Sequence, residues 1–278
     1  MDTTTLSPGL YIVATPIGNL GDLTARAAEV LRSADLVLAE DKRVTAKLLA
    51  HIGARARMQA YHDHSSEADR AAILARLASE AVALVSDAGT PLISDPGYKL
   101  VRAAREAGLA VHTLPGPSAV IAALTLAGLP TDRFLFAGFL PPKAKARADA
   151  ITELAGVRAT LVFYEGGSRI AECLAALREG LGDRDAAVVR EISKLHEECL
   201  AGRLSELVEQ VMDRPPRGEI VVVVGPPAER AEASDEELDA ALIAAMADAS
   251  PSRAAADIAQ RLGVPRKRAY ARALELSR

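Results

Sequence analysis

The sequence predicts an α/β protein of two domains that is followed by a small helical appendage. Three observations lead to this prediction. Short β-like runs alternate with amphipathic runs from the start of the chain, the run Val82–Ser86 (VALVS) has the apolar character of a strand buried on both faces, and the sign of the charge reverses near the C-terminal end. The expected parts are an α/β domain over residues 1–116, a second α/β domain over residues 117–228 and a helical, helix-turn-helix-like tail over residues 229–278.

The composition is that of a globular protein whose core is built from Ala, Val, Leu and Ile. Half of the 278 residues are hydrophobic and a quarter are charged, whereas aromatic residues make up 3% and Trp is absent. The scarcity of aromatic residues argues against a stacking platform for single-stranded RNA. The formal net charge of −4 also argues against a chain that wraps nucleic acid along its length, so any RNA would have to meet a local basic patch.

The cysteines and the N-terminal segment favour a reduced, cytoplasmic setting. Cys173 and Cys199 are the only cysteines, and they form neither a disulfide framework nor a C-x-x-C pair. Residues 1–8 lack the basic and apolar regions of a signal peptide, and no apolar stretch approaches the roughly 20 residues that span a bilayer. For the H-D-H motif at residues 62–64 we favour a capped polar loop over a metal site, and we expect no metal in the protein.

The first domain is expected to build one mostly parallel sheet with helices on both faces, because its strands and helices alternate. Turn signals such as Pro16 and Gly108 close the individual elements. The expected strands are Leu10–Thr15, Leu36–Ala39, Val82–Ser86 and Ala110–Leu114, and the expected helices are Thr24–Ser33, Val44–Ile52, Ser66–Ala78 and Gly97–Ala107.

The Pro-Gly-Pro turn at residues 115–117 marks the start of the second α/β unit. Ser118 is placed to cap the helix that follows the turn. The segment Lys143–Arg147, which comes after two prolines, is basic and is expected to be mobile. The expected helices are Ser118–Ala127, Ala148–Leu154, Ile170–Leu181 and Leu204–Met212, and the expected strands are Phe134–Phe139, Thr160–Tyr164, Ala187–Glu191 and Glu219–Gly225.

Two glycine-containing turns at strand ends are candidate ligand sites, because ligands of open α/β sheets lie beyond the carboxyl ends of the strands. The turn over residues 15–22 (TPIGNLGD) fails the dinucleotide fingerprint G-x-G-x-x-G, and an ordinary βα turn explains it equally well. The turn over residues 86–91 (SDAGTP) is followed by another over residues 94–97 (SDPG). Asp87 ends a buried strand, where a charge is costly without a partner, and Gly89 permits a positive φ. For the turns over residues 86–91 and 94–97 we therefore favour a functional role over an ordinary helix entry.

Two further turns also lead from a strand into a helix. The turn over residues 115–119 (PGPSA) would offer free N–H groups to a carboxylate, although it also reads as a domain junction. The turn over residues 164–169 (YEGGSR) contains Glu165, which a favourable interaction with a helix N-terminus explains without a ligand.

Eight segments of the chain carry a resemblance to a known family: LYIVATPIGNLGDLTARA, AEDKRVTAKLL, YHDHSSE, VALVSDAGTPLISDPGYKLV, LPGPSAVIAALTLAGLPTDRFLFAGFLP, FYEGGSR, REISKLHEE and GEIVVVVG. Together they resemble the small-subunit ribosomal RNA cytidine-2′-O-methyltransferases, which belong to the class III, tetrapyrrole-methylase-like methyltransferases. The resemblance runs in register from about residue 10 to residue 225, and its SDAGTPLISDPG block is long and specific.

The resemblance implies a two-domain class III methyltransferase fold, S-adenosylmethionine as the cofactor and a homodimer. It implies that the partner is 16S rRNA in the small ribosomal subunit, where the ribose of cytidine-1402 receives a methyl group on its 2′-oxygen. By the family's pattern, the residues that contact the methyl donor are Pro16, Ile17, Asp87, Ala88, Gly89, Thr90, Ser118, Ala119, Tyr164, Gly218, Glu219 and Ile220.

The chain departs from the family in three charged motifs, which are usually AEDTR, YES-x-x-R and RELTK. Here they read AEDKR, YEGGSR and REISK, so that the charged positions remain and the loop detail changes. Arg43, Arg169 and Arg190 in these motifs are expected to bind phosphates of the RNA.

A ribose hydroxyl must lose its proton during methyl transfer, so a nearby base is expected. The charged motifs supply the candidates, which the sequence leaves unranked. A lysine among them would need a lowered pKa, which the neighbouring Arg190 could assist. The candidate catalytic residues are Glu40, Asp41, Glu191 and Lys194.

The tail has an acidic half and a basic half. Residues 232–250 hold six acidic residues and no basic one, whereas residues 251–278 hold seven basic residues against two acidic ones. One helix is expected to begin near Pro251 and to end at Gly263, and a second is expected to start with Pro265 at its first position. Helix, glycine turn and helix form the pattern of a helix-turn-helix.

The second tail helix is expected to present one apolar and one basic side. Tyr270 and Leu274 would form the apolar side. Arg266, Lys267 and Arg268 are the candidate residues for binding rRNA phosphates. The alternative is a small helical cap whose charges face water.

Two other functions remain open on this sequence. A tetrapyrrole C-methyltransferase would share the fold, but its first loop is expected to be of the G-x-G-x-G type rather than TPIGN, and the basic tail has no obvious use with a porphyrinoid. A non-catalytic ribosome-assembly factor would show a basic surface without a pocket for a methyl donor.

Overall fold

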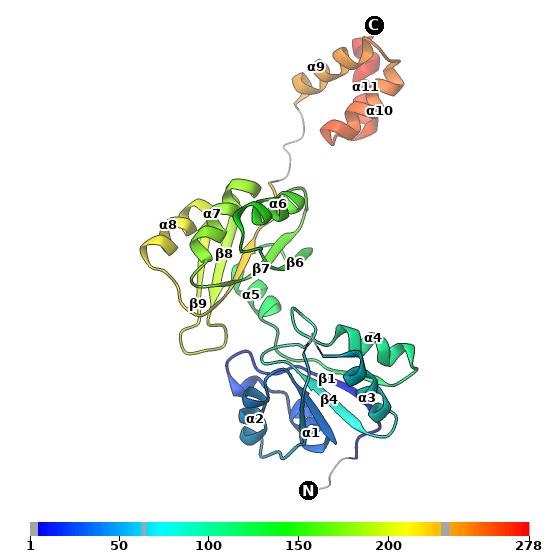
Figure 1. The fold of residues 1–278 in the computed structure, drawn as a ribbon. Helices are drawn as coiled ribbons and strands as arrows, with labels where there is room; N and C mark the ends of the chain where they lie inside the picture. Colours follow the sequence, from blue (N-terminus) through cyan, green and yellow to red (C-terminus); the bar gives the residue numbers. More distant parts are fainter. Residues whose placement is uncertain (1–4, 63–64, 229–233, 278) are drawn as a thin grey trace. The chain divides into compact units, whose positions relative to one another are not determined.

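The computed structural model describes residues 5–62, 65–228 and 234–277 (Figure 1). The chain forms two compact units, Met1–Pro227 with two β-sheets and Ala228–Arg278 with helices. Because both sheets belong to one compact unit, separate domains over residues 1–116 and 117–228 stay a prediction. The predicted polar loop at residues 62–64 lies partly outside the described residues. No helix in the described part of the chain is long and apolar enough to cross a bilayer.

The first sheet is entirely parallel, as its sequence predicts. It consists of β1 (Gly9–Val13), β2 (Leu36–Ala39), β3 (Met58–Ala60), β4 (Ala81–Val85) and β5 (Val111–Leu114) in the order β3-β2-β4-β1-β5. Strands β1 and β4 are buried along their whole length, which explains their continuous apolar sequence. The prediction missed β3, because this three-residue edge strand is partly exposed and has no apolar run.

Helices cover both faces of the first sheet. The first layer consists of α1 (Ala25–Ser33) and α2 (Lys42–His51), and the second of α3 (Glu67–Leu77) and α4 (Tyr98–Glu106). Alternate residues of the strands face the two layers, so that Val13 packs with Leu31 on one side and Ile12 packs with Ile73 on the other. All four helices begin and end within three residues of the predicted positions.

The strand order places a ligand crevice beside β1 and β4. The connection from β1 leads across β4 to β2, whereas the connection from β4 leads across β1 to β5, so the two connections leave neighbouring strands in opposite directions. Such a topological switch point opens a crevice at the carboxyl ends of the strands. The β1–α1 loop, which contains the short helix η1 (Leu20–Asp22), and the β4–α4 loop both start at this edge.

The second sheet is mixed. It consists of β6 (Phe134–Phe139), β7 (Thr160–Gly166), β8 (Asp185–Arg190), β9 (Glu198–Arg203) and β10 (Glu219–Val224) in the order β6-β7-β10-β8-β9. Only β6 and β7 pair in parallel, and the other neighbours are antiparallel. The sequence analysis missed β9, because half-exposed residues of mixed character give this edge strand no clear pattern.

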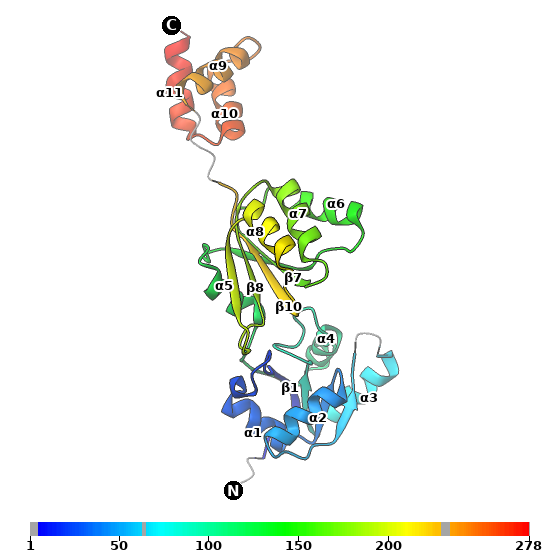
Figure 2. The same cartoon turned by 90° about the vertical axis from the view of Figure 1, so that its left-hand side faces the viewer.

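Helices also cover both faces of the second sheet. On one face lies α5 (Ala119–Ala127), and on the other lie α6 (Ala144–Leu154), α7 (Ile170–Leu181) and α8 (Leu204–Asp213) (Figure 2). Phe163 is fully buried against the three helices, whereas Val162 faces α5. The ends of β7, β8 and β10 therefore carry side chains to two different sides of the sheet.

The expectation of a mobile loop at Lys143–Arg147 is wrong, because these residues form the N-terminal turn of α6. Lys143 is the N-cap residue, and the helix starts with Ala144. Arg147 is only 8% exposed and donates to Glu172 of α7 over 3.3 Å and to the carbonyl of Pro142 over 3.4 Å. The long side chain of Arg147 thus closes the core beneath the two prolines.

The helical unit contains α9 (Asp235–Met246), α10 (Pro251–Leu262) and α11 (Arg266–Leu276). Gly263 ends α10 in the left-handed conformation, as predicted, whereas Pro265 is the N-cap residue of α11 rather than its first residue. The prediction of an apolar side at Tyr270 and Leu274 is wrong, since both side chains are 43% exposed. Small residues let α11 pack closely, and the buried ones are Ala269 and Ala273.

Pairing between α9 and α11 explains the charge reversal along the tail. Arg272 forms two hydrogen bonds to the carboxylate of Asp239, at 2.6 and 2.7 Å. Arg268 donates to Asp235 over 2.9 Å. The acidic and basic halves of the tail are therefore partners within one unit, and two of the seven basic residues in its basic half, Arg268 and Arg272, are paired with α9.

Candidate functional site

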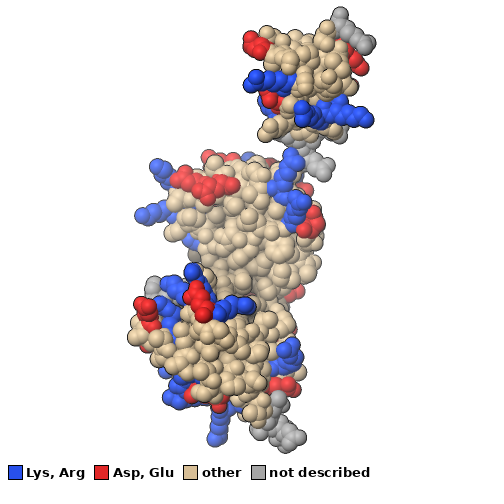
Figure 3. Space-filling model, turned by 90° about the vertical axis from the view of Figure 1, so that its right-hand side faces the viewer, with Lys and Arg blue, Asp and Glu red and all other residues tan. Residues whose placement is uncertain are grey.

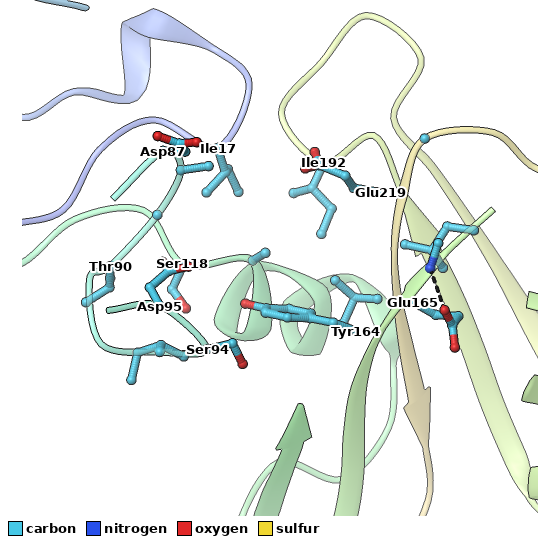
Figure 4. Close-up of a pocket in the computed structure, with 18 of the residues that line it drawn as sticks. Ile17, Asp87, Thr90, Ser94, Asp95, Ser118, Tyr164, Glu165, Ile192 and Glu219 are labelled. Atoms are coloured by element: carbon cyan, nitrogen blue, oxygen red, sulfur yellow. Dashed lines mark hydrogen bonds between the residues drawn. The ribbon is translucent and has the colours of Figure 1, made fainter. Parts of the chain in front are cut away.

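A cavity of about 370 Å³ lies in the first unit, where loops from the carboxyl end of the first sheet meet strand ends of the second (Figure 4). The loops after β1 and β4 form one side, and the ends of β7, β8 and β10 form the other. Its lining combines carboxylates, backbone and apolar side chains, contributed by Ile17, Glu40, Asp87, Ala88, Gly89, Thr90, Ile93, Ser94, Asp95, Ser118, Ala119, Phe139, Tyr164, Glu165, Gly166, Glu191, Ile192, Lys194, Gly218, Glu219, Ile220 and Val221.

Two backbone hydrogen bonds tie the loops after β1 and β4 together. The N–H of Thr15 donates to the carbonyl of Gly89 over 2.8 Å, and the N–H of Gly89 donates back over 3.0 Å. Gly89 has a φ of +80°, and a Cβ atom there would lie 3.3 Å from Ile17. A side chain at this position would therefore be strained and would crowd the cavity wall. This geometry agrees with the positive φ predicted for Gly89.

Asp87 is exposed to the cavity, and its partner is the backbone of the loop after β2. Its Oδ1 accepts a hydrogen bond from the N–H of Asp41 over 3.0 Å. Asp41 in turn caps α2 by accepting from the N–H of Arg43 over 2.8 Å. The Asp87 carboxylate thus fixes the loop after β2 beside the cavity and keeps its remaining acceptor sites for a ligand.

The second Gly/Pro-rich turn, at residues 92–97, has a strained backbone. Leu92 and Ser94 have φ values of 76° and 63°, which are unusual for residues with a side chain. Gly97 has a φ of 132°, and a Cβ there would lie 2.7 Å from Leu84. This conformation directs Ser94 and Asp95 to the cavity, opposite Tyr164 (Figure 4). Sequence analysis singled out this turn without assigning its residues to the site.

The first turn of α5 borders the cavity through Ser118 and Ala119. Ser118 is the N-cap residue, but its side chain makes no capping hydrogen bond, contrary to the prediction. The turn is held instead by Thr90, whose hydroxyl donates to the carbonyl of Pro117 over 3.1 Å. The N–H of Val120 hydrogen-bonds to Tyr164, and the rest of the N-terminus of α5 is available to an anionic group of a ligand.

An aromatic cluster forms the side of the cavity on the second sheet. The ring of Tyr164 meets Phe136 and Phe139 edge-on, with centroid distances of 4.7 and 5.5 Å. Phe139 reaches the cavity because Gly138, with a φ of 65°, lies in a register shift between β6 and β7. Burial and the carboxylates of Asp95 and Glu219 raise the pKa of Tyr164, so its hydroxyl stays protonated.

Glu165 lines the cavity but turns its carboxylate back into the second sheet. Its Oε1 accepts from the N–H of Gly166 over 2.8 Å and from Nε of Arg169 over 2.8 Å. Figure 4 shows Glu165 beside the strand end. The side chain of Glu165 is only 2% exposed, so the ion pair with Arg169 is largely desolvated. A buried charge of this kind requires its partner, and the phosphate-binding role of Arg169 stays a prediction.

Lys194 is the cation of the cavity, and it lies between two carboxylates. Its Nζ is 3.1 Å from Oε1 of Glu191 and 3.1 Å from Oε2 of Glu219. Burial alone would lower the pKa of Lys194, but the hydrogen bonds to both carboxylates outweigh it and raise the pKa above the ordinary value. The lowered pKa that a lysine base would need is therefore not found for Lys194. Arg190 does not assist Lys194, since it pairs with Glu198 over 2.6 Å.

The loop between β8 and β9 reaches across to the loop after β1. Lys194 packs over Gly18, where a Cβ would lie 2.5 Å from two carbons of the lysine chain. The hydroxyl of Ser193 donates to the carboxylate of Asp22. Ser193 itself has a φ of 66°. Glycine at position 18 thus makes room for the lysine that contacts both halves of the cavity.

The structure gathers most of the predicted site residues at this cavity. Glu40, Glu191 and Lys194 line it, as do the predicted donor-binding residues other than Pro16, which borders an adjacent cavity of about 320 Å³. Asp41 lies outside the cavity lining, and the hydrogen bonds with Arg43 lower its pKa to about 2. The lining residues that the sequence analysis did not assign are Ile93, Ser94, Asp95, Phe139, Glu165, Gly166, Ile192 and Val221.

Neither cysteine lines the cavity. Cys173 is buried in the core on the α7 face of the second sheet, where burial raises the pKa of its thiol to about 12. Cys199 does not line the cavity. Over residues 5–62, 65–228 and 234–277, no group of three or more His, Cys, Asp or Glu side chains is arranged to hold a metal ion.

Comparison with known proteins gives two family matches. Residues 9–208 match the tetrapyrrole (corrin/porphyrin) methylases, and residues 232–277 match the RsmI C-terminal HTH domain. The chain is 55% identical to the ribosomal RNA small subunit methyltransferase I of Erythrobacter litoralis, over 98% of this chain and 96% of that protein. It is 47% identical to the protein of the same name from Mesorhizobium japonicum, over 98% and 93% of the two chains.

A solved structure shares the fold of the first unit. The uroporphyrin-III C-methyltransferase of Thermus thermophilus, complexed with S-adenosylhomocysteine, superposes with a TM-score of 0.54 over 78% of this chain and 97% of that chain. The sequence identity of 24% makes this a likeness of fold. The predicted class III, tetrapyrrole-methylase-like architecture is confirmed by this match and by the family match of residues 9–208.

Two substitutions test the loop after β4. Asp87→Ala removes the acceptor for the Asp41 N–H, and Gly89→Val places a branched side chain at a φ of +80°. Both should weaken binding of S-adenosylmethionine in calorimetry, with a loss of at least about tenfold in affinity for Asp87→Ala. Circular dichroism should show that both variants remain folded.

Matched controls lie away from the cavity. Asp149 is exposed on α6, and Gly156 has open space where its Cβ would be. Asp149→Ala and Gly156→Val should retain the affinity of the unmodified protein. Normal donor affinity in Asp87→Ala and Gly89→Val would contradict the assignment of this loop.

Proposed function

The chain belongs to the tetrapyrrole methylase family and is an S-adenosylmethionine-dependent methyltransferase, and from this premise we propose that it methylates the ribose 2′-hydroxyl of cytidine-1402 in 16S rRNA. The observation that carries the choice of rRNA is the near full-length similarity to small subunit rRNA methyltransferases, which includes the helical tail. The partner is then the small ribosomal subunit, and the place of action is the cytoplasm.

The cavity fits the chemical parts of S-adenosylmethionine. When bound, this cofactor supplies an electrophilic methyl group on a positively charged sulfur. Asp87 and Asp95 offer negative charge to its cationic groups, and the ring of Tyr164 offers a face to a cation. The open N–H groups at the start of α5 suit its carboxylate, and Ile192 and Ile220 offer apolar contact to its adenine.

Lys194 is placed to stabilise negative charge on the acceptor oxygen. It remains protonated, because Glu191 and Glu219 hold its ammonium group. A preorganised cation in a partly buried site stabilises an alkoxide that develops as the hydroxyl loses its proton. The proton itself passes to a carboxylate of the cavity, for which Glu40 and Glu191 are the two candidates that line it.

Two features support further parts of the proposal. Large apolar side chains are exposed on α5 and β6, at Ile121 (50%), Leu126 (40%) and Phe134 (44%), and a homodimer would cover such a surface.

On the face shown in Figure 3, basic and acidic side chains are interspersed over each unit. Binding of RNA therefore depends on local groups of basic residues rather than on the net charge of −4.

Methylation assays with purified small ribosomal subunits test the proposed reaction. The protein should transfer labelled methyl groups from S-adenosylmethionine to 16S rRNA, and mass spectrometry of the released nucleosides should identify 2′-O-methylcytidine. A methylated base, or methylation of a porphyrinoid instead of rRNA, would contradict the proposal. Binding of rRNA without any binding of S-adenosylmethionine would identify a non-catalytic assembly factor.

Substitution of Lys194 tests its role as a permanent cation. Lys194→Met should lower kcat by about 10²- to 10³-fold, because the developing alkoxide loses its electrostatic partner. Lys194→Arg, which keeps the charge, should retain more activity. Because the pKa of Lys194 is raised above its ordinary value of 10.5, the ammonium group stays protonated throughout the neutral range. The pH profile of the unmodified enzyme should therefore show no inflection from this residue between about pH 6 and about pH 9. An unchanged kcat in Lys194→Met would exclude this role.

The tail should contribute to rRNA affinity through its unpaired basic residues. Arg266 and Lys267 are exposed at the start of α11, whereas Arg268 is engaged with Asp235. Replacing Arg266 and Lys267 with Gln should weaken binding of small subunits and reduce the slope of log affinity against log salt by up to about two. Affinity for S-adenosylmethionine should not change.

The Arg253→Gln, Arg261→Gln variant, on α10, provides a control of the same charge change within the tail. An unaltered affinity and salt slope in the Arg266→Gln, Lys267→Gln variant would show that the tail is a helical cap whose charges face water.

A further inference from the structure

A second cavity of about 410 Å³ lies on the opposite face of the second sheet from α5, beside the strand ends that border the donor cavity. Arg190 and Leu200 reach it because they alternate with the residues of β8 and β9 that face α5. The segment between α8 and β10 closes its other side. We call it the arginine cleft, and its lining consists of Arg190, Glu198, Leu200, Gln210, Asp213, Arg214, Pro215, Pro216 and Arg217.

The backbone that carries Arg214 and Arg217 is held in place. Two prolines, each with a fixed φ, separate the two arginines, and Pro216 is buried. The carbonyl of Pro216 lies so close to Gly167 that any Cβ there would overlap it. The N–H of Gly167 also donates to the carbonyl of Gly218 over 3.2 Å. The two guanidinium groups therefore start from a preorganised turn rather than from a loose loop.

The charges of the arginine cleft are only partly balanced. Arg190 pairs with Glu198 over 2.6 Å. Arg214 and Arg217 are exposed, and neither forms an ion pair or a side-chain hydrogen bond with another described residue. Three arginines thus face two carboxylates, Glu198 and Asp213, in a chain whose net charge is −4. Unpaired guanidinium groups on a rigid turn are suited to bidentate binding of phosphate.

The arginine cleft and the donor cavity share two stretches of backbone. Arg190 precedes Glu191, and Arg217 precedes Gly218, and both following residues line the donor cavity. Arg190 is the last residue of β8 and Glu219 is the first of β10, so the two cavities border the same two strand ends.

We propose that Arg214 and Arg217 bind the sugar–phosphate backbone of the rRNA strand next to the target nucleotide. The partner is the RNA backbone rather than a free nucleotide, because the cleft is open to the surface and borders the same strand ends as the donor cavity. Leu200 and Pro215 offer apolar contact to the adjoining sugar, and Arg190 is fixed by Glu198 at the inner wall. The inference rests on the proposed rRNA methylation and names two residues that position its substrate.

Replacing both arginines tests this inference. The Arg214→Gln, Arg217→Gln variant should raise the KM for small ribosomal subunits by about tenfold or more, because charge-assisted hydrogen bonds are lost. It should reduce the slope of log affinity against log salt by about 1.4, the value for two phosphate contacts on single-stranded RNA. The kcat at saturating substrate and the calorimetric affinity for S-adenosylmethionine should change little, which also shows that the variant is folded.

The matched control removes two exposed arginines elsewhere. Arg105 lies on α4 and Arg178 on α7, and neither lines either cavity. The Arg105→Gln, Arg178→Gln variant has the same net charge as the test variant and should keep the KM and salt slope of the unmodified enzyme. An equal rise of KM in both variants would show a general charge effect and would overturn the inference.

Binding of a fluorescein-labelled 16S rRNA fragment, followed by anisotropy, separates this inference from the proposed function. Weaker binding by the Arg214→Gln, Arg217→Gln variant, with no methylation by the unmodified protein, would support the cleft and overturn only the reaction. Equal RNA affinity of variant and unmodified protein would overturn the cleft even if rRNA is methylated. Competition by free AMP as strong as that by the RNA fragment would identify a nucleotide site and overturn the choice of partner.

Discussion

The pair of backbone hydrogen bonds between Thr15 and Gly89 is the constraint on which the site depends. It holds together the loops after β1 and β4, the two central strands whose connections leave in opposite directions. The crevice of an open sheet opens at such a point. Only a residue without a side chain meets Thr15 at a φ of +80° while leaving the wall beside Ile17 free. Asp87, two residues before Gly89, then reaches the N–H of Asp41 and joins the loop after β2 to the same wall.

Charge at the site is arranged so that each buried or half-buried ion has a fixed partner. Glu165 is the most buried carboxylate of the cavity lining. Arg169, four residues later in the chain, forms an ion pair with it and balances its negative charge. Lys194 is held by Glu191 and Glu219, which keeps it charged in the resting enzyme. The electrostatic partner of a developing anion is thus in place before any substrate binds, which is the condition for strong stabilisation.

Internal ion pairs also reduce the number of basic side chains that the tail can offer to RNA. Arg268 and Arg272 are held by Asp235 and Asp239 of α9, so the charge reversal in the sequence describes the assembly of three helices as well as a surface for RNA. In the first unit, by contrast, Arg214 and Arg217 have no such partners among the described residues. Unpaired arginines on a rigid turn are therefore a better guide to a phosphate site than a count of basic residues.

The sequence by itself determined the parallel first sheet, the site loops and the family, because buried strands and glycine-containing turns require particular residues at particular positions. Gly89 and Asp87 were identifiable in this way. Only the tertiary structure determines the edge strands β3 and β9, because their residues follow no strong hydrophobic pattern. It also determines the orientation of Phe139, whose side chain reaches the cavity because of a register shift. The tertiary structure also determines that Lys194 stays protonated and that Arg268 is paired with Asp235. Electrostatic partners depend on side chains that are far apart in sequence, and no local pattern encodes their distance.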